Sequence, residues 1–494
     1  MVPISDDITK QKLEKLAHLR ASGIDPFPYG YHRTHTTKQA VSLVEQNKEI
    51  LLTQEFMVNV AGRIMAKRAM GKSAFLDLRD DSGRIQLFFR INNLGEEKYN
   101  HVKAIDIGDI VGAKGKLCLT RTGEPTVEIQ EFALLAKSLQ PLPEKWHGLS
   151  DVEKRYRQRY IDLISNPDVK NIFIIRSKVI GAIRDFLNKR DFLEVETPVL
   201  QPEAGGATAR PFITHHNTLD RDFYLRIALE LHLKRLIIGG FDKVYEIGRI
   251  FRNEGISIKH NPEFTMLESY ETYADYKDVM MMLEEMVSSV CQQVHGSNKV
   301  EFNGQIIDFT PPWKRIDMRQ AIIQYANLDI QEYSDTESLK NVMSQRSMRF
   351  DPNKDRGKLI DEIVSTYVDP QFIQPTILFD YPIEMSPLAK KKPGSDNIVE
   401  RFEAYCAGME IANAFTELND PIDQRQRFVK QMESRAAGDE EAAAMDEDFI
   451  TAMEHGMPPT GGLGVGIDRL VMILTNQQSI REVILFPALR EKVE

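Results

Sequence analysis

Residues 246–268 read EIGRIFRNEGISIKHNPEFTMLE, and this stretch decides the fold of the larger part of the chain. Apolar residues on both sides of it predict two neighbouring strands joined by a short connection. A tight hairpin would favour Asn-Gly or Asp-Gly at that point, yet the connection carries Arg252, Glu254 and His260 among other charged residues. So much charge between two strands indicates a functional site rather than a simple turn.

The length and composition of the chain exclude several classes of protein. With 494 residues it is too long for one compact core, so we expect at least two domains. A hydrophobic content of 42% and a charged content of 28% are typical of soluble globular proteins. There is no secretory signal and no apolar run long enough to cross a bilayer, so we expect no membrane partner. Three cysteines without a CxxC pair predict a reducing, cytoplasmic location and neither a disulfide framework nor a zinc site.

The N-terminal third of the chain has a different pattern from the rest. A helix is predicted over 5–22, and five short strands are predicted between 56 and 136, with a helical stretch near 95–104. This arrangement favours a small Greek-key barrel of the oligonucleotide-binding (OB) type, although another small β-barrel remains open. Phe75 and Gln86 lie on adjacent predicted strands, where an aromatic ring can stack on a base and an amide can read its edge. Phe75 could equally belong to the core.

The charge is unevenly distributed along the chain. The net charge is −10, but residues 1–150 have a balance of +3 and the remainder a balance of −13. A mildly basic N-terminal part followed by an acidic remainder is compatible with nucleic acid binding at the N-terminal part, although solvated surfaces also produce such a balance.

We place the domain boundary near residue 148, within a charged linker punctuated by prolines. The predicted domains are 1–148, a helix plus the OB barrel, and 149–494, an antiparallel sheet surrounded by helices and carrying a helical insertion. The fold class is therefore α+β. The segment GGLGVGIDRL predicts a glycine-rich strand that leads into a helix and presents Arg469 in its first turn. Neither a P-loop nor a Rossmann glycine motif is present, so any ATP site must belong to another fold.

Three segments together carry a family resemblance. FRNE…HNPEF resembles motif 2 of the class II aminoacyl-tRNA synthetases, FLEVETPVL resembles motif 1, and GLGVGIDRL resembles motif 3. Within that class, RYRQRYIDLI, GGATARPFITHHN, DYPIEMSPLAK and EIANAFTELNDP resemble the bacterial type of lysyl-tRNA synthetase. The resemblance covers nearly the whole chain. It implies a lysine–tRNA ligase that forms lysyl-adenylate from lysine and ATP and then transfers lysine to the 3′ end of tRNA(Lys).

The resemblance also implies a nucleotide site. Arg252 and Arg469 would be the catalytic arginines, Arg252 on the substrate carboxylate and the α-phosphate, and Arg469 over the adenine and the γ-phosphate. Glu403 and Glu410 would hold Mg²⁺, which prefers hard oxygen ligands. The further residues implied to bind ATP are Glu254, His260, Asn261, Phe264 and Glu403.

For the amino acid, the resemblance implies a second set of residues. The α-amine would bind Glu230 and the Gly206 carbonyl, and the ε-ammonium would bind Glu417 and Tyr270 with support from Glu268. Arg252, Asn413 and Phe415 complete the implied lysine site.

The acids of that site agree with lysine on physical grounds. Glu230, Glu268 and Glu417 would make a negative pocket, suited to a substrate with two amines and unsuited to aspartate. An aspartyl- or asparaginyl-type enzyme, a lysine ligase that modifies a protein, and an inactive paralogue that binds RNA are the alternatives. The acids could also be plain surface charges.

Strand periodicity raises one difficulty. Regular alternation places Asn413, Phe415 and Glu417 on one face but turns Glu410 to the other. If Glu410 is a metal ligand, we expect an irregularity between Glu410 and Asn413.

The resemblance extends to the barrel and to assembly. It places the central anticodon base on Phe75, with Arg63, Gln86 and Glu131 reading nearby edges. Because motif 1 builds a two-fold interface in this class, we also expect a homodimer.

Overall fold

The computed structural model describes residues 7–50, 53–143, 149, 151–436 and 445–491. The chain divides into two compact units, Met1–Ser150 and Asp151–Glu494. The boundary expected at residue 148 falls outside the described residues, as do residues 5 and 6 of the expected first helix. Among the described residues, no helix is long and apolar enough to cross a membrane.

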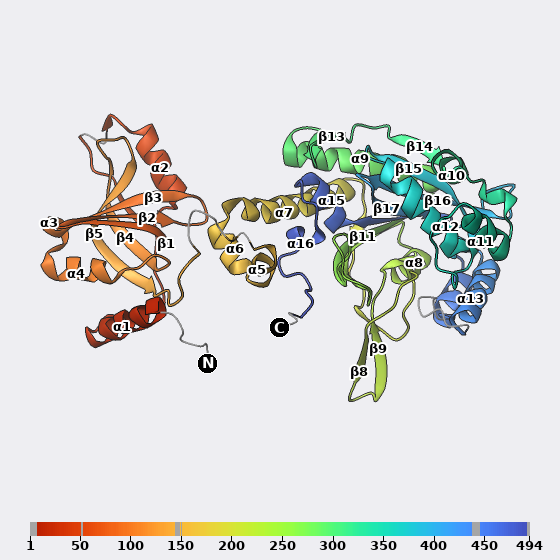
Figure 1. Ribbon diagram of the computed structural model, residues 1–494, viewed down its shortest axis with the longest axis horizontal. Coiled ribbons are helices and arrows are strands. Elements are labelled where there is room, and N and C mark those ends of the chain that lie inside the picture. Colours follow the sequence, from red (N-terminus) through yellow and green to blue (C-terminus); the bar gives the residue numbers. More distant parts are fainter. Residues whose placement is uncertain (1–6, 51–52, 144–148, 150, 437–444, 492–494) are drawn as a thin grey trace. The chain divides into compact units, whose positions relative to one another are not determined.

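The first unit is built on a closed barrel of five strands in the order β1-β2-β3-β5-β4 (Figure 1). The strands are β1 Met57–Met70, β2 Ser73–Arg79, β3 Arg84–Arg90, β4 Ile110–Leu119 and β5 Pro125–Ala136. The accompanying helices are α1 Asp7–Ala21, α2 Thr37–Gln46, α3 Ile91–Leu94 and α4 Glu96–Ala104. The prediction of five strands with a helix near 95–104 is confirmed.

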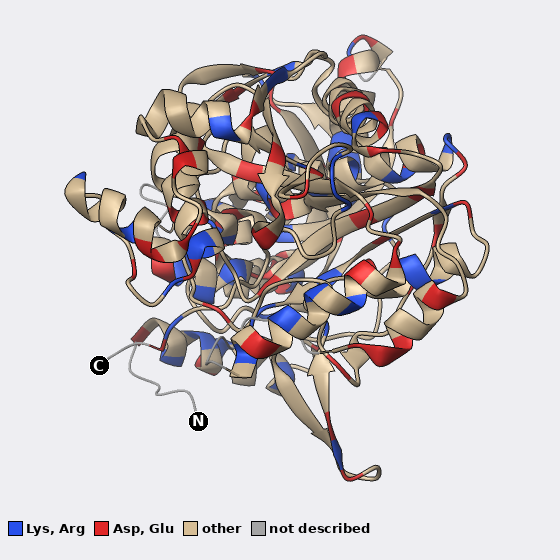
Figure 2. Cartoon of the chain, turned by 90° about the vertical axis from the view of Figure 1, so that its right-hand side faces the viewer, with Lys and Arg blue, Asp and Glu red and all other residues tan. Residues whose placement is uncertain are grey.

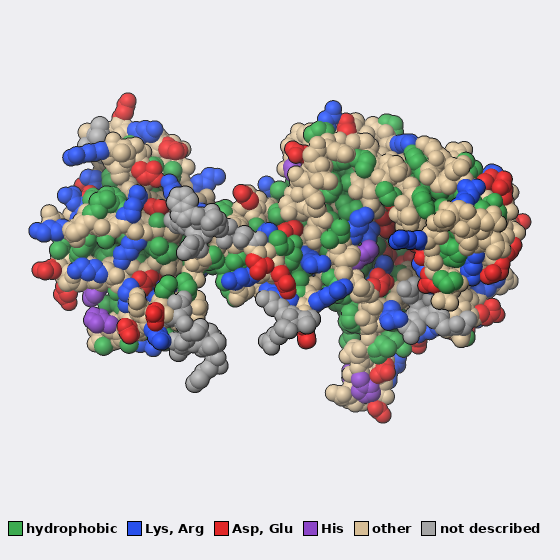
Figure 3. Space-filling model, in the orientation of Figure 1, with side chains coloured by type: hydrophobic (Ala, Val, Ile, Leu, Met, Phe, Trp, Pro, Cys, Tyr) green, Lys and Arg blue, Asp and Glu red, His purple; other side chains and the backbone are tan. Residues whose placement is uncertain are grey.

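Alternation along β2 explains how the barrel separates core from surface. Ala74, Leu76 and Leu78 are buried in the barrel interior, whereas the residues between them are only partly buried. Phe75 therefore lies on the outer face, as a base-stacking ring requires. Lys and Arg side chains are spread over much of the visible face of this unit (Figure 3).

The second unit is organised around an eight-stranded sheet in the order β14-β15-β16-β17-β18-β11-β10-β6. Only the pairs β14–β15 and β10–β6 at its two edges are parallel, and the remaining pairs are antiparallel. The strands are β6 Leu193–Glu194, β10 Lys243–Phe251, β11 Glu263–Thr272, β14 Lys314–Asp317, β15 Thr376–Pro382, β16 Ile398–Cys406, β17 Met409–Thr416 and β18 Thr460–Gly466. The predicted strand pair around residues 252–262 is thus confirmed as β10 and β11.

Helices cover the sheet and extend its edge. Helices α7, α9 and α15 pack on the sheet in one core that includes Ile183, Leu283 and Leu470, and a second core joins α10–α12 to β15 (Figure 1). The helices of this unit are α5 Val152–Arg157, α6 Arg159–Ser165, α7 Pro167–Asn188, α8 Glu230–Ile238, α9 Tyr276–His295, α10 Met318–Ala326, α11 Thr336–Gln345, α12 Arg356–Ile363, α13 Pro421–Ala436, α14 Glu447–Glu454, α15 Ile467–Leu474 and α16 Ile480–Val483.

Two small sheets complete the second unit. One pairs β12 (Lys299–Phe302) with β13 (Gln305–Asp308), and the other has the order β7-β9-β8. The hairpin of β8 (Ile213–His216) and β9 (Arg221–Leu225), which pairs with β7 (Leu200–Gln201), projects from this unit (Figures 1 and 2). Figure 2 also shows Lys and Arg interspersed with Asp and Glu on the outer helices.

The irregularity expected in β17 is present. Ala404 pairs with Ala412, but the next residue, Tyr405, pairs with Glu410, so that Ile411 is an extra residue on β17. An extra residue shifts the phase of side-chain alternation. Glu410 and Asn413 can therefore share one side of the sheet, and the prediction is confirmed.

Candidate active site

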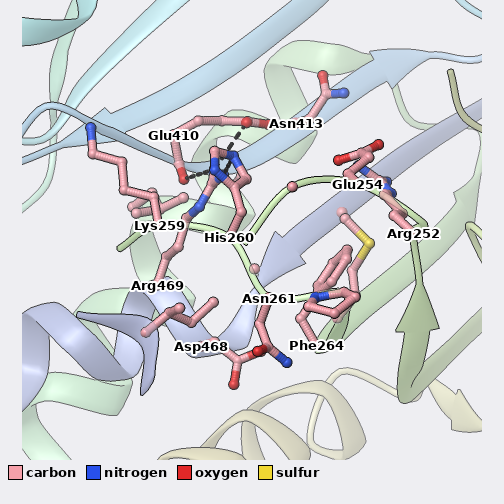
Figure 4. Close-up of a pocket in the computed structure, with 18 residues that line it drawn as sticks. Arg252, Glu254, Lys259, His260, Asn261, Phe264, Glu410, Asn413, Asp468 and Arg469 are labelled. Carbon is pink, nitrogen blue, oxygen red and sulfur yellow. Dashed lines mark hydrogen bonds and ion pairs between the residues drawn. The ribbon is translucent and has the colours of Figure 1, made fainter. Parts of the chain in front are cut away.

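A cavity of about 260 Å³ opens where the β10–β11 connection meets β17, β18 and the start of α15 (Figure 4). Predicted site residues from the connection, β11, β17 and α15 line it: Arg252, Glu254, His260, Asn261, Phe264, Glu410, Asn413 and Arg469. The charged connection that interrupts the hairpin is thus one wall of a cavity.

Arg469, Glu410 and His260 form a polar cluster at one end of the cavity (Figure 4). Arg469 Nη1 donates to the Glu410 carbonyl oxygen at 2.8 Å and to Glu410 Oε2 at 3.1 Å, and Nη2 lies 3.2 Å from His260 Nε2. Burial, followed by the positive charge of Arg469, lowers the pKa of His260. A neutral imidazole here can accept a hydrogen bond from a guanidinium without repelling it.

Arg252 and Phe264 form the other end of the cavity (Figure 4). The guanidinium carbon of Arg252 lies 5.3 Å from the centroid of the Phe264 ring, within the range of a cation–π contact. Arg252 Nε donates to the carbonyl oxygen of Ile227 at 3.3 Å, which holds the guanidinium group in place. Burial lowers the pKa of Arg252, but an arginine guanidinium stays protonated in proteins. The two terminal nitrogens can therefore meet an anion in the cavity.

Two contacts hold the walls of this cavity in place. Asn261 is buried, and its amide donates to the carbonyl of Glu263 at 2.6 Å and accepts from the backbone of Ala488 at 3.2 Å. Arg176 on α7 donates to Asp468 at 2.6 Å, next to Arg469. Helix α7, which precedes the segment that resembles motif 1, thus anchors the residue beside Arg469.

A group of buried acids continues along β11 beyond the cavity. Glu268 accepts hydrogen bonds from the Leu229 backbone at 2.9 Å and from the Tyr270 hydroxyl at 2.9 Å. Burial, then the charge of Glu230, raises the pKa of Glu268 to about 7. A methyl group on Gly462 would lie 1.9 Å from Glu417 Oε1, so only glycine leaves room for that carboxyl group. Burial raises the pKa of Glu417 to about 8.

A lysine that the sequence interpretation missed joins two of these acids. Lys234 on α8 is fully buried, and its Nζ lies 2.5 Å from Glu230 Oε1 and contacts Glu417 Oε2. Among the described residues, Glu417 Oε1 has no hydrogen-bond partner. The spacing of Glu230 and Lys234 at i and i+4 on a helix was the available signal for the first pair. Nothing local in the sequence indicated the second.

The predicted metal ligands lie on neighbouring strands. Glu403 accepts from the hydroxyl of Tyr381 at 2.9 Å, is close to Tyr405, and is ion-paired with Arg401. Burial, then the charge of Glu403, raises the pKa of Glu410. Burial together with both glutamates also raises the pKa of Asp369 to about 8.

The carboxyl groups of Glu403 and Glu410 can be compared with the ligands that Mg²⁺ prefers. The charge of Glu403 contributes to the raised pKa values of Glu410 and Asp369, so the three carboxyl groups lie near one another, and their hard oxygens suit Mg²⁺. Among the described residues, however, no group of three or more His, Cys, Asp or Glu side chains is arranged to hold a metal. Two carboxylates fit a Mg²⁺ ion whose other ligands are water and phosphate oxygens, as is usual for this ion.

The remaining predicted residues lie around the acids. Gly206 has φ +85°, and a methyl group there would approach the Glu230 side chain to 3.3 Å. Phe415 faces the guanidinium of Arg401 at 5.6 Å, and Arg401 Nε donates to Asn413 at 3.2 Å. Arg401 was also missed, although it precedes Glu403 by two residues and so shares its strand face.

In the barrel, the predicted residues have defined neighbours. Phe75 stacks on Phe88 across the β2–β3 pair with ring centroids 4.3 Å apart, and Gln86 accepts from the Thr126 hydroxyl at 3.1 Å. Arg63 donates to the Gly108 carbonyl at 2.7 Å, and Glu131 is ion-paired with Lys114 at 3.4 Å. Phe88 extends the aromatic surface beyond the single predicted ring.

Family comparisons agree with this geometry. Residues 151–490 match the family described as tRNA synthetases class II (D, K and N), and residues 58–135 match the OB-fold nucleic acid binding domain. The second unit is therefore a class II synthetase domain, and the barrel is an OB fold.

Curated relatives refine that class. Lysine–tRNA ligases of Dehalococcoides mccartyi (strain 195), Moorella thermoacetica and Clostridium perfringens are 59%, 54% and 52% identical to this chain. The alignments cover 98%, 99% and 97% of this chain, and 98%, 99% and 95% of those proteins. The chain belongs to the lysine–tRNA ligase family.

Proposed function

We propose that this protein activates L-lysine with ATP to lysyl-adenylate and transfers the lysyl group to the 3′ end of tRNA(Lys). The observation that carries the proposal is the buried acid pocket of Glu230, Glu268 and Glu417, which adjoins the cavity lined by Arg252 and Arg469. Identities of 52–59% to lysine–tRNA ligases over nearly the whole chain support it.

The acid pocket suits both amines of lysine. We assign the α-amine to Glu230 and the Gly206 carbonyl, and the ε-ammonium to Glu417 and Tyr270, with Glu268 between them. Among the described residues Glu417 Oε1 has no hydrogen-bond partner, so this oxygen can accept a hydrogen bond from an ammonium group. A substrate that leaves such a buried carboxylate unpaired loses about 3–5 kcal/mol, which disfavours neutral amino acids of similar length.

The cavity suits ATP. We place the adenine against Phe264 with Glu254 at its amino group, His260 and Asn261 on the nucleotide side, and Arg469 toward the γ-phosphate. Arg252 would hold the substrate carboxylate and the α-phosphate together, aided by Asn413. Its guanidinium can make two parallel hydrogen bonds to such oxygens.

The chemistry then requires positioning rather than a side-chain nucleophile. A lysine carboxylate oxygen attacks the α-phosphorus, the bond from that phosphorus to the bridging oxygen breaks, and pyrophosphate leaves. Arg252 stabilises the charge that builds up on the α-phosphate and aligns the two reactants. In the second step the terminal tRNA hydroxyl attacks the lysyl carbonyl, and AMP leaves.

Glu403 and Glu410 would hold Mg²⁺ beside the phosphates. When bound, this ion neutralises part of the negative charge of the phosphates, which the two arginines alone would neutralise incompletely. Arg469 already contacts Glu410, so the pair can shift from an internal ion pair to separate phosphate and metal contacts.

The barrel would read the anticodon. We assign the central base to Phe75, with Gln86, Arg63 and Glu131 at nearby edges, and expect the protein to act as a cytoplasmic homodimer. Base stacking on an aromatic ring contributes about 1–3 kcal/mol.

ATP–pyrophosphate exchange without tRNA, run with each of the twenty amino acids in turn, tests the proposal. We expect exchange with lysine alone. Exchange with aspartate or asparagine would show that the three glutamates do not line the pocket. A complete lack of exchange that persists when tRNA is added would indicate an inactive paralogue.

A further inference from the structure

Lys234 is the one component of the acid pocket for which the proposed reaction has no use so far. It belongs to α8, its side chain is fully buried, and its ammonium sits between Glu230 of the same helix and Glu417, which follows β17. Burial opposes its charge, but the two carboxylates more than offset that effect, and the pKa of Lys234 is raised. The side chain is therefore a fixed internal cation.

The two partners of Lys234 serve opposite ends of the substrate in the proposed function. Glu230 is assigned to the α-amine and Glu417 to the ε-ammonium. An ammonium in contact with both carboxylates restrains their separation and their orientation. It also leaves one oxygen of Glu417, Oε1, without a partner among the described residues.

The charges in and around the pocket add a second argument. Glu230, Glu268 and Glu417 contribute three negative charges when ionised, and Lys234 contributes one positive charge. A bound lysine brings two ammonium groups, while its carboxylate goes to Arg252. Three negative and three positive charges then face one another, and no buried charge remains uncompensated.

The other charged or titratable groups around the pocket are already engaged. Tyr270 on β11 donates to Glu268, Arg401 on β16 is ion-paired with Glu403, and the guanidinium of Arg252 lies over the Phe264 ring. In the part of the chain that the structure describes, Lys234 is the cation that forms ion pairs with Glu230 and Glu417.

We infer that Lys234 is a positioning residue that makes the pocket selective for the charge of the substrate. It holds Glu230 and Glu417 at the two ends of the pocket and supplies one fixed positive charge, so that the site accepts an amino acid with two ammonium groups. The inference rests on the proposed function. In the empty pocket three carboxyl groups face one cation. The inference therefore predicts that these carboxyl groups bind protons when the pocket is empty and release them when lysine binds.

The test is the pH profile of lysine binding, measured by titration calorimetry on the full-length protein between pH 6 and 9. Two buffers of different ionisation enthalpy give the number of protons released. We expect Lys234→Met to weaken lysine binding at pH 7 by about tenfold or more and to move the midpoint of the profile up by about one pH unit, because a neighbouring positive charge lowers a carboxyl pKa by about 1–3 units.

Two further comparisons separate this role from a structural one. Lys137 of the barrel is also fully buried between two acids, Asp106 at 2.7 Å and Asp109 at 2.8 Å, so Lys137→Met is the matched control and should leave the midpoint unchanged. If Lys234→Met does not fold, Glu230→Gln is compared with Glu230→Gln/Lys234→Met. The double variant leaves two pocket carboxyl groups without a cation, whereas Lys234→Met alone leaves three. The double variant should have the higher midpoint.

The outcomes distinguish the inference from the proposed function. An unchanged midpoint in Lys234→Met, or equal midpoints in the second pair, would overturn the inference while wild-type lysine exchange stands. A wild-type protein that neither binds nor activates lysine would overturn both.

Discussion

Replacing Gly462 with alanine should selectively damage lysine binding. The added methyl group would lie 1.9 Å from Glu417 Oε1 and 2.7 Å from the Tyr270 ring, closer than carbon atoms approach such groups. Both neighbours are buried and cannot swing into solvent. Glu417 must therefore leave the position in which it would receive the ε-ammonium of the substrate.

The size of the effect follows from the lost pair. Breaking one partner of a buried ion pair costs about 3 kcal/mol or more, which corresponds to on the order of a hundredfold in KM for lysine. The KM for ATP should change far less, because the methyl group points at the acids rather than at the cavity proposed to bind ATP, whose lining does not include Gly462.

ATP–pyrophosphate exchange gives both constants for the same preparation. Gly464→Ala is the matched comparison on the same strand, since its methyl group would be 3.4 Å from Met266, an ordinary contact, and should raise the KM for lysine by less than about threefold. Glu417→Gln should reproduce the loss without added bulk. A Gly462→Ala protein with native melting temperature and unchanged KM for lysine would refute the assignment of Glu417.

Three other measurements test separate parts of the site. The KM for lysine should fall as pH rises from about 6 to 8.5, because Glu268 and Glu417, with pKa values raised to about 7 and about 8, must lose protons before they can hold ammonium groups; a flat profile would contradict the buried-acid pocket. Arg469→Lys should raise the KM for ATP about tenfold, since lysine lacks the fork that spans Glu410 and His260, and equal KM values would exclude a role for that fork. Phe75→Leu should raise the KM for tRNA in charging assays about tenfold from lost stacking, and an equal loss in exchange without tRNA would show that the barrel had been misread.

The sequence predicted the parts of the fold that depend on local pattern. The five barrel strands, the strand pair around the charged connection and the glycine-rich strand before α15 all follow from residue alternation and turn residues. Even the β17 irregularity was predictable, because Glu410 and Asn413 could share a side of the sheet in no other way. Several of the segments that line the cavity were also predicted, since they carry recognisable motifs.

Contacts between distant segments could not be predicted in the same way. The pairing of Lys234 with Glu417 depends on how α8 packs beside the end of β17, and the lysine alone looks like any surface residue of an amphipathic helix. Phe88 stacks on Phe75 because the strand register places them opposite each other, and a one-residue slip would have removed that contact. Arg401 contacts Asn413 and Phe415 of the neighbouring strand β17, and these contacts exist only in the folded sheet.

The extra residue in β17 separates two tasks along one strand. Before Ile411, the strand presents Glu410 to the cavity, for which we propose a role beside the phosphates, and after it the strand presents Asn413, for which we propose a role at the amino acid. Substitutions in the second half can therefore alter which amino acid is recognised while the phosphate-activating half stays intact, which suits a family whose members include D, K and N types. The same arrangement makes strand length inflexible: deleting Ile411 would restore regular alternation and turn one of the two functions away from the site.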